Sequence, residues 1–299
     1  MHFNLTDLRL FVQLAEAGSM TAASKRVHLS VASISTRIKA LEENMMARLI
    51  WRSSRGTELT PAGERLLKHA RLILGQVDAL KLEFQEGDDA DIGHVRVFAN
   101  TTTVKEILPE ILAGFLAEHP SVSIDLQERP HRDIARAVMD GSADIGIVTG
   151  PFKGSDVDVL HFSTDQLVTI VPKGHPLAQH GTVTLAQVVE HPLIVMYEGS
   201  TLANFLRERM EEYGHELHTR IQLYSYESIC RMVEVGVGVG IVPSSAIRRH
   251  SKTMQFDTLV LNEPWVTRER SVLVRDLELL PACAKALIKA ITEYQSPED

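Results

Sequence analysis

The first 42 residues carry the pattern that most restricts the fold: three short amphipathic helices separated by tight turns. In residues 5–17 the apolar side chains recur at helical spacing, and Gly18 then ends the run as a helix C-cap would. The apolar stripe of this segment consists of Leu8, Phe11, Val12 and Ala15. Ser19 can cap a second helix, whose apolar face is Met20, Ala23 and Val27.

A third helix is expected from Val31 to about Glu42, capped by Ser30. Its inward stripe consists of Ile34, Ile38 and Leu41. Two short helices, a tight turn and a third helix predict a helix-turn-helix, in which the last helix reads the major groove of DNA.

The outward face of this third helix is small, hydroxylated and basic, which suits insertion into the groove and bonding to phosphates and base edges. A plain solvated helix face is the alternative. On the first interpretation, the DNA-binding residues of the helices are Thr21, Ser30, Val31, Ala32, Ser33, Ser35, Thr36, Arg37 and Lys39.

Residues 49–60 predict a short hairpin, with Arg52 and Arg55 beside a tip that ends at Gly56. Such a wing can place arginine along a phosphate backbone or in a narrow minor groove, where the negative potential is strongest. We therefore add these three residues to the expected DNA contacts.

A long helix is expected from Thr60 and Pro61 onward, with a hydroxyl cap and proline at the first helical position. Apolar residues then recur at alternating steps of four and three, which is a heptad seam. Packing of this helix against its own domain is the alternative to a dimer coiled coil, which we favour. The seam consists of Leu66, Ala70, Ile73, Val77, Leu80 and Phe84.

The stretch from about Leu5 to Ala79 resembles the winged helix-turn-helix and linker helix of LysR-type transcriptional regulators. The positions that carry the resemblance are Asp7, Leu8, Arg9, Phe11, Gly18, Ser19, Thr21, Ala23, Leu29, Ser30, Ser33, Ser35, Ile38, Leu41, Glu42, Glu43, Arg48, Leu49, Arg52, Arg55, Gly56, Leu59, Thr60, Ala62 and Gly63. Later segments follow the same family's effector domain, so the resemblance covers nearly the whole chain.

Four positions depart from the family pattern. Met46 stands where the family often has glycine, and Ile50 where it often has phenylalanine. Val31 and Ala32 replace a glutamine and a proline or serine after the helix cap. These apolar side chains cannot make a bidentate contact to adenine but can touch a thymine methyl group, so sequence preference should differ at that step.

The charge distribution supports a DNA-binding head. Residues 1–72 contain 11 Lys and Arg and 6 Asp and Glu, a net +5, whereas residues 73–299 contain 20 and 33, a net −13. Only the head is thus suited to a polyanion. The sequence contains no run of ~18 uncharged apolar residues and no secretion signal at its start, which predicts a cytoplasmic protein without membrane association.

After about residue 91, strands and helices alternate, which favours mostly parallel sheets covered by helices. We therefore expect an α+β multidomain fold: a winged helix-turn-helix, a long linker helix and a two-subdomain α/β effector domain. The expected strands are residues 95–99, 123–127, 144–148, 166–171, 193–197, 219–224 and 239–242, and the expected helices are residues 107–118, 131–140, 202–213 and 227–235. The family resemblance implies that the chain then returns to the first subdomain with residues 270–275 and a final helix at 281–294.

Ligands of such sheets bind beyond the carboxyl ends of strands, near helix N-termini. The segments there are mostly small and hydroxylated, which suits a polar small molecule, although simple helix capping would also explain them. The candidate effector-binding residues are Asn100, Thr101, Thr102, Thr103, Arg129, His131, Thr149, Glu198, Gly199, Ser200, Thr201, Glu227 and Ser228. Because this set contains both cationic and anionic side chains, the sequence leaves the charge of the ligand open.

The family resemblance implies a discontinuous first subdomain, similar to periplasmic solute-binding proteins, with an inducer held between the two subdomains. The expected division is 1–60 for the DNA-binding domain, 61–87 for the linker helix and 91–299 for the effector domain, with subdomain 1 at about 91–163 and 267–299 and subdomain 2 at about 164–266. The expected partners are double-stranded promoter DNA, a small-molecule effector and further copies of the chain, as a homodimer through the linker helix and a homotetramer; RNA polymerase is a further candidate.

Other functions have weaker support. An enzyme would need a nucleophile or an acid and base set, and the sequence contains none of the GxSxG, HExxH or GxxxxGK motifs; no cofactor or metal site is expected. A transporter's solute-binding component would fit the last two thirds of the chain but would not explain the basic head. A thiol-based redox regulator centred on Cys230 is the remaining alternative, although Cys230 and Cys283 both suit reduced, buried thiols.

Overall fold

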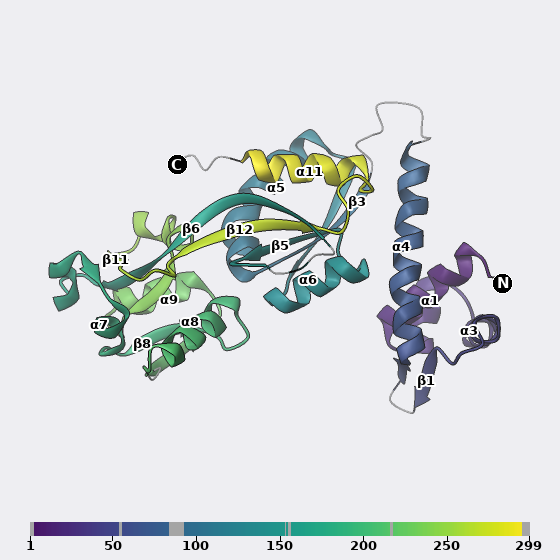
Figure 1. The fold of residues 1–299 in the computed structure, drawn as a ribbon, viewed down its shortest axis with the longest axis horizontal. Helices are drawn as coiled ribbons and strands as arrows, with labels where there is room; N and C mark the ends of the chain where they lie inside the picture. The colour runs from purple at the N-terminus through teal and green to yellow at the C-terminus, as the bar shows by residue number, and fades with distance from the viewer. Residues whose placement is uncertain are drawn as a thin grey trace.

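The computed structural model describes residues 3–53, 56–83, 93–152, 154, 157–215 and 218–294. A helical head, one long helix and an elongated α/β body follow one another along the chain (Figure 1). The predicted DNA contact Arg55 and the predicted seam residue Phe84 lie outside the described residues.

The three predicted helices of the head are present as α1 (Leu5–Ala17), α2 (Met20–Val27) and α3 (Val31–Met45). Three of their caps, Gly18, Ser19 and Ser30, are the predicted residues. The hydroxyls of Ser19 and Ser30 each accept a hydrogen bond of 3.1 Å from a backbone N–H of the following turn, and Gly18 ends α1 at a φ of +66°. The head core joins Leu10, Phe11 and Leu14 of α1 to Ile34, Ile38 and Leu41 of α3.

The predicted wing is an antiparallel hairpin of β1 (Ile50–Ser53) and β2 (Gly56–Leu59). It is held on the turn between α1 and α2, because the backbone N–H of Thr57 donates a 2.8 Å hydrogen bond to the carbonyl of Gly18. Gly56 adopts a φ of +136°, and a Cβ there would lie 2.6 Å from the Gly18 oxygen. Only glycine fits this approach.

The long helix is α4 (Pro61–Glu83), and the Thr60 hydroxyl caps it by accepting from the N–H of Gly63 at 3.0 Å. The start of the helix packs on its own head, since Ala70 and Leu74 are buried against Leu8 and Val12 of α1. Leu66 also packs there. Packing of this helix against its own domain, the alternative to the favoured coiled coil, is therefore correct for its first half, because α1 has a second apolar face. Ile73 and Leu80 remain exposed.

The first half of the body is a sheet covered on both faces. The sheet order is β4 (Val122–Glu128), β3 (Gly93–Ala99), β5 (Ile145–Thr149) and β12 (Thr267–Val274). Alternate residues of these strands point to opposite faces, so one face packs on α5 (Leu108–Glu118) and α11 (Ala282–Glu293) and the other on α6 (His131–Asp140). The predicted helices of this half are thus confirmed.

Two strands cross into the second half of the body. The 15-residue β6 (Asp158–Pro172) pairs with β12 over residues 158–166 and with β10 (Gly240–Pro243) and β11 (Phe256–Leu261) over residues 167–172. All three partners run antiparallel to β6. The expectation of mostly parallel sheets is therefore wrong here, because two crossing strands that leave and return side by side must run in opposite directions.

The remaining elements build a second core around the far half of β6 (Figure 1). They are β7 (Thr182–Val183), α7 (Leu185–Val189), β8 (Leu193–Met196), α8 (Thr201–Glu212), β9 (Thr219–Leu223), α9 (Tyr226–Glu234) and α10 (Ser244–Ile247), with short turns at Pro176–His180 and His250–Lys252. Strands β8 and β9 pair in parallel.

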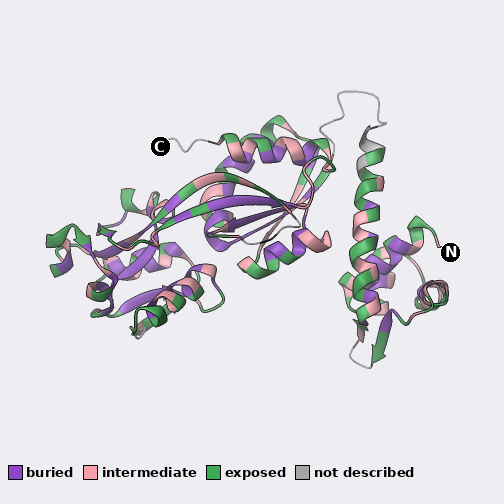
Figure 2. Cartoon of the chain, in the orientation of Figure 1, coloured by how far each residue is buried: buried purple, intermediate pink, exposed green. Residues whose placement is uncertain are grey.

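Burial follows the layers: the strands and the inward faces of the helices are buried, and the outward faces are exposed (Figure 2). Cys230 in α9 and Cys283 in α11 are buried and are not joined in a disulfide, as expected. Among the described residues, no helix combines the length and the apolar character needed to span a bilayer.

Candidate DNA-binding surface and effector cleft

The predicted recognition face of α3 lies on the surface of the head. Val31 is 42% exposed, and Ala32, Thr36 and Lys39 are also exposed, as are Thr21 of α2 and the cap Ser30. Ser33, Ser35 and Arg37 are partly exposed. The face lies opposite the buried stripe of Ile34, Ile38 and Leu41, so it is free to meet another molecule.

One arginine of the wing points to this face. The Arg52 guanidinium donates a 2.9 Å hydrogen bond to the Ser35 hydroxyl, which places a cation at the junction of wing and recognition helix. Arg37 has a different role, because it pairs with Asp7 of α1 at 3.2 Å. The Arg37 pair therefore holds α3 on α1, and the Arg52 bond holds the wing beside α3.

Glu42 and Met46 shape the connection from α3 to the wing. The Glu42 carboxylate accepts hydrogen bonds from the backbone N–H groups of Leu49 at 2.8 Å and Ile50 at 3.3 Å. Met46 ends α3 in the left-handed conformation, at a φ of +48°, with a side chain that is 93% exposed. A non-glycine residue is strained there, which explains why its departure from the family pattern matters.

A cavity of about 30 Å³ lies where β6 and β12 cross between the two halves of the body. Six of the predicted effector-binding residues line it: Asn100, Thr101, Thr102, Thr149, Ser200 and Thr201. They come from the ends of β3, β5 and β8, as the rule for ligands at the carboxyl ends of strands predicts.

Several of these side chains already have protein partners. The Asn100 amide donates to the Thr149 hydroxyl at 2.7 Å, and the Thr101 hydroxyl donates to Glu128 at 2.6 Å. Ser200 caps α8 by accepting from the N–H of Ala203 at 3.0 Å. These bonds fix the cavity wall, and the helix-capping alternative is thus correct for Ser200 even though the residue also lines the cavity.

Polar contacts at and near the cavity join the two halves of the body. The hydroxyls of Thr102 and Tyr226 lie 2.8 Å apart, and the Tyr197 hydroxyl donates to Glu128 at 3.2 Å. Lys105, in a π-helical turn at Thr103–Ile107, donates to the carbonyl of Tyr224 at 2.9 Å. The wall is therefore held by bonds that an opening motion would have to break.

On its other side the cavity meets an open cleft of about 690 Å³ between the start of α6 and the flank of α8. Thr149, Thr201 and Arg268 line both spaces, so they stand at the junction. The predicted His131 lines the cleft. Burial and the charge of Arg268 lower the pKa of His131, so its neutral form is favoured.

The other predicted effector residues lie outside the lining of both spaces. Thr103 is buried, Arg129 bonds to Gln127 at 2.7 Å, and Glu198 pairs with Arg207 at 3.1 Å. Gly199 is exposed beside Tyr197, Glu227 is exposed, and Ser228 is bonded to Ser225 at the start of α9.

The sequence analysis missed the charged residues of the cavity: Asp165 of β6 and Arg268 and Arg270 of β12. Arg270 pairs with Asp165, whose carboxylate also accepts from the hydroxyls of Ser244 at 2.7 Å and Ser245 at 2.6 Å. A signal was present, because two arginines two residues apart in a strand share one face of a sheet.

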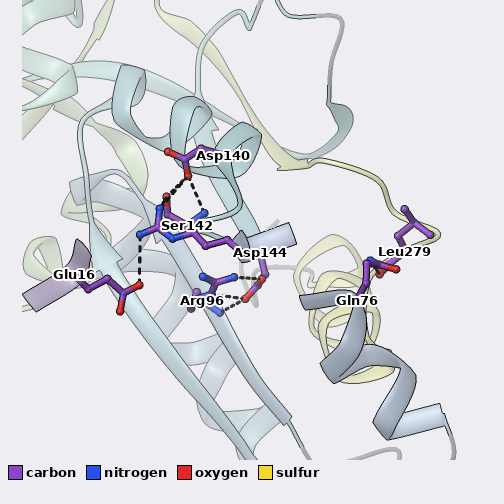
Figure 3. A network of polar contacts seen from close by, with 8 residues as sticks. Glu16, Gln76, Arg96, Asp140, Ser142, Asp144 and Leu279 are labelled. Atoms are coloured by element: carbon purple, nitrogen blue, oxygen red, sulfur yellow. Dashed lines mark hydrogen bonds and ion pairs between the residues drawn. The ribbon is translucent and has the colours of Figure 1, made fainter. Parts of the chain in front are cut away.

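A second polar network joins the head to the body (Figure 3). Arg71 of α4 pairs with Glu16 of α1 at 3.4 Å and with Asp140 at the end of α6 at 3.7 Å, and it donates to the Ser142 hydroxyl at 2.9 Å. Gln76 of α4 donates to the carbonyl of Leu279 at 3.3 Å. The start of α6 faces the cleft, so this helix connects the cleft with the linker helix.

Comparison with family models decides the identity. Residues 5–64 match the model described as bacterial regulatory helix-turn-helix protein, lysR family, and residues 88–296 match the LysR substrate binding domain. The chain belongs to the LysR family of transcriptional regulators. It is a DNA-binding regulator with a substrate-binding domain, as the sequence analysis predicted.

Relatives and solved structures agree with this LysR assignment. The chain is 25% identical to the HTH-type transcriptional regulator CzcR of Bacillus thuringiensis subsp. konkukian over 97% of each chain. It is similar in fold to a cysteine-to-aspartate variant of full-length OxyR from Pseudomonas aeruginosa (22% identity, TM-score 0.77, covering 98% of this chain and 99% of that one) and to full-length CbnR complexed with its target DNA (21%, 0.62, 97% and 99%).

A thiol-based redox regulator would need a reactive cysteine, so the burial and the pKa of Cys230 decide how well this alternative fits. Cys230 is fully buried, and burial raises its pKa to about 12, so the reactive thiolate is strongly disfavoured near neutral pH. The described residues also contain no cluster of histidine, cysteine, aspartate and glutamate that could hold a metal ion.

Proposed function

We propose that this LysR regulator binds promoter DNA through α3 and the wing, and that a small molecule in the cleft changes this binding. The observation that carries the proposal is the exposed face of α3, joined by Arg52 to the wing, within residues 1–72, which have a net charge of +5. The structure of CbnR with its target DNA supports the same use of this fold.

The residues divide by the contact that they offer. Val31, Ala32, Ser33, Ser35 and Thr36 face the bases, and Ser30, Thr21 and Lys39 face phosphates at the groove edge. We expect Arg52 and Gly56 of the wing, and Arg55 between them in the sequence, to contact the phosphate backbone or the minor groove. The valine and alanine at the start of α3 favour contact with thymine methyl groups.

The cavity and cleft form the proposed effector site, built from Asn100, Thr101, Thr102, Thr149, Ser200, Thr201 and His131. Helix α6 provides the route from this site to the DNA-binding head. Its first residue lines the cleft, and its last residue contacts Arg71 of the linker helix. An effector that shifts α6 would change the position of α4 and hence of the head.

We further propose that α4 pairs two copies of the chain through Ile73, Val77 and Leu80, and Phe84 beyond them, since Ile73 and Leu80 are exposed. Two heads then read two half-sites, and two dimers form a tetramer that meets RNA polymerase in the cytoplasm. In this proposal the chain carries out no catalysis. The boundaries at residues 60, 87, 163 and 266 separate the DNA-binding domain, the linker helix and the two effector subdomains.

The test is selection of genomic duplex fragments by the purified protein, followed by sequencing. We expect an enriched sequence family for the parent protein, weaker binding to all fragments for Arg52→Ala, and an altered preference at one base step for Val31→Gln. A protein that enriches no fragments at low ionic strength would contradict the proposal.

A further inference from the structure

We propose that the effector of this regulator carries an anionic group, a carboxylate or another oxyanion, and that Arg268 binds it. The inference rests on the proposed use of the cleft as the effector site. It specifies the chemical class of the ligand, which the sequence leaves open.

The buried charges around the cavity do not balance. In the described part of the chain three charged residues are buried, Asp165, Arg268 and Arg270, with exposed fractions of 7%, 8% and 4%. All three line the same cavity. Asp165 and Arg270 neutralise each other, so the cavity wall keeps one uncompensated positive charge. A buried charge without a partner is costly, which makes a bound anion favourable.

The Arg268 side chain is held in place by its neighbours. Its guanidinium carbon lies 3.8 Å from the centre of the Phe205 ring. Gly150 also lies close to the guanidinium. It has a φ of +91°, and a Cβ at that position would lie 3.0 Å from the Arg268 Nη2 atom. The guanidinium is therefore fixed in place by the ring and by a glycine that makes room for it.

The Arg268 guanidinium has N–H donors available to a ligand. A guanidinium has five N–H donors, and the described residues accept one hydrogen bond from it, at 3.3 Å, through the carbonyl of Thr149. They provide no carboxylate for an ion pair with Arg268. Burial lowers the pKa of Arg268 to about 10, which still leaves the group charged near neutral pH.

The neighbouring groups fit the same ligand. Thr102 and Thr201 line the cavity together with Arg268, and α8 begins there, so the positive end of its helix dipole lies at the cavity. The cavity of about 30 Å³ holds about two water-sized groups, so it accepts the oxygens of an anion but not a larger body. The remainder of the molecule would lie in the 690 Å³ cleft.

The experiment measures the stability and the ligand affinity of the full-length chain in small anions at matched ionic strength. The probes are sodium acetate, sodium benzoate and sodium sulfate, with acetamide and benzamide as neutral counterparts and sodium chloride as the reference. Trp265, whose ring lies 5.7 Å from that of Phe205, provides a fluorescence signal at the site.

Two variants are compared with the parent. Arg268→Met removes the unpaired charge but keeps an apolar chain against Phe205. Arg96→Met is the matched control, because Arg96 is a partly buried arginine of the same sheet that is paired with Asp144 at 2.7 Å.

We expect at least one carboxylate, or sulfate, to stabilise the parent more than its neutral counterpart or chloride does. Arg268→Met should weaken the affinity for that anion at least ~10-fold. Arg96→Met should lose stability in every solution and keep the anion response. A response to sulfate alone identifies an inorganic oxyanion, and a response to acetate or benzoate identifies an organic acid.

The inference is overturned if no anion exceeds chloride and the neutral counterparts, or if Arg268→Met keeps the full response. DNA binding is measured on the same samples. If DNA binding persists in that case, the regulator function stands without the anionic effector; an anion response without DNA binding would instead remove the regulator function and leave the anion site.

Discussion

The head and the body of this regulator use charged residues in opposite ways. In the described residues of the head and linker helix, the buried polar or charged side chain is Thr60, and the cations Arg52 and Lys39 lie at the surface. The body instead buries Asp165, Arg268 and Arg270 around one cavity. Surface charge suits a large polyanion and is screened by salt, whereas buried charge suits one small ligand and is screened much less.

The largest effect on stability is expected from a substitution of Asp165. Asp165→Asn leaves Arg270 without its partner, so the free energy of unfolding of the body should fall by about 3–5 kcal/mol, as it does when one member of a buried pair is removed. The same change raises the charge of the cavity and should tighten anion binding. Urea unfolding of a Trp51→Phe background, followed through Trp265, measures the loss.

The control for this prediction is a matched change in the head. Glu58→Gln removes an exposed carboxylate of the wing and should leave stability unchanged within about 0.5 kcal/mol. Equal losses for the two variants would remove the distinction between buried and surface charge.

The second effect concerns the contact between the two regions. Arg71→Ala removes the bonds to Glu16, Asp140 and Ser142, so the effector should change DNA affinity less strongly. We expect the coupling free energy to fall by about 1 kcal/mol. Titration of labelled promoter DNA with and without effector gives the value.

Lys68→Ala, on the exposed side of the same helix, is the control for Arg71 and should leave the coupling unchanged. An Arg71→Ala protein with the parent's coupling would show that α6 and α4 do not transmit the signal.

A smaller effect is expected at the end of α3. Met46→Gly relieves the left-handed backbone and loses no packing, because the side chain is exposed. The head should gain about 1 kcal/mol, since the relief of strain exceeds the entropy that glycine adds to the unfolded chain. Thermal unfolding followed through Trp51 in a Trp265→Phe background measures the gain, and Met46→Ala should show none.

The smallest effect is a pH dependence at the mouth of the cleft. The folded state lowers the pKa of His131 from 6.5, so the unfolded state binds its proton first and the body loses stability as pH falls through and below that value. His131→Gln should flatten this loss. Stability curves from pH 8 to pH 5 that coincide for parent and variant would exclude His131 as the source.

Much of this molecule could be predicted from the sequence, and the misses have physical causes. The head followed from caps at Gly18, Ser19 and Ser30, because local hydrogen bonds decide where a helix ends. The cavity segments at Asn100, Thr149 and Ser200 followed from the strand ends. Local patterns could place these residues without knowledge of distant contacts.

The residues that the sequence analysis missed depend on long-range pairing. Strand β6 begins at Asp158, earlier than predicted, because its first half is specified by pairing with β12 more than 100 residues later. Arg268 and Asp165 meet only through that pairing. The same holds for Leu66 and Ala70, whose heptad spacing suits a partner helix but whose contact is with α1.

The most direct test of the account is the salt dependence of promoter affinity for the parent, Arg52→Ala and Arg268→Met. Arg52→Ala should weaken binding and lower the slope of log K against log salt by about 1, whereas Arg268→Met should leave the effector-free slope unchanged. An unchanged slope for Arg52→Ala, or an equal loss for Arg268→Met, would contradict the division between a surface that binds DNA and a buried site that binds an anion.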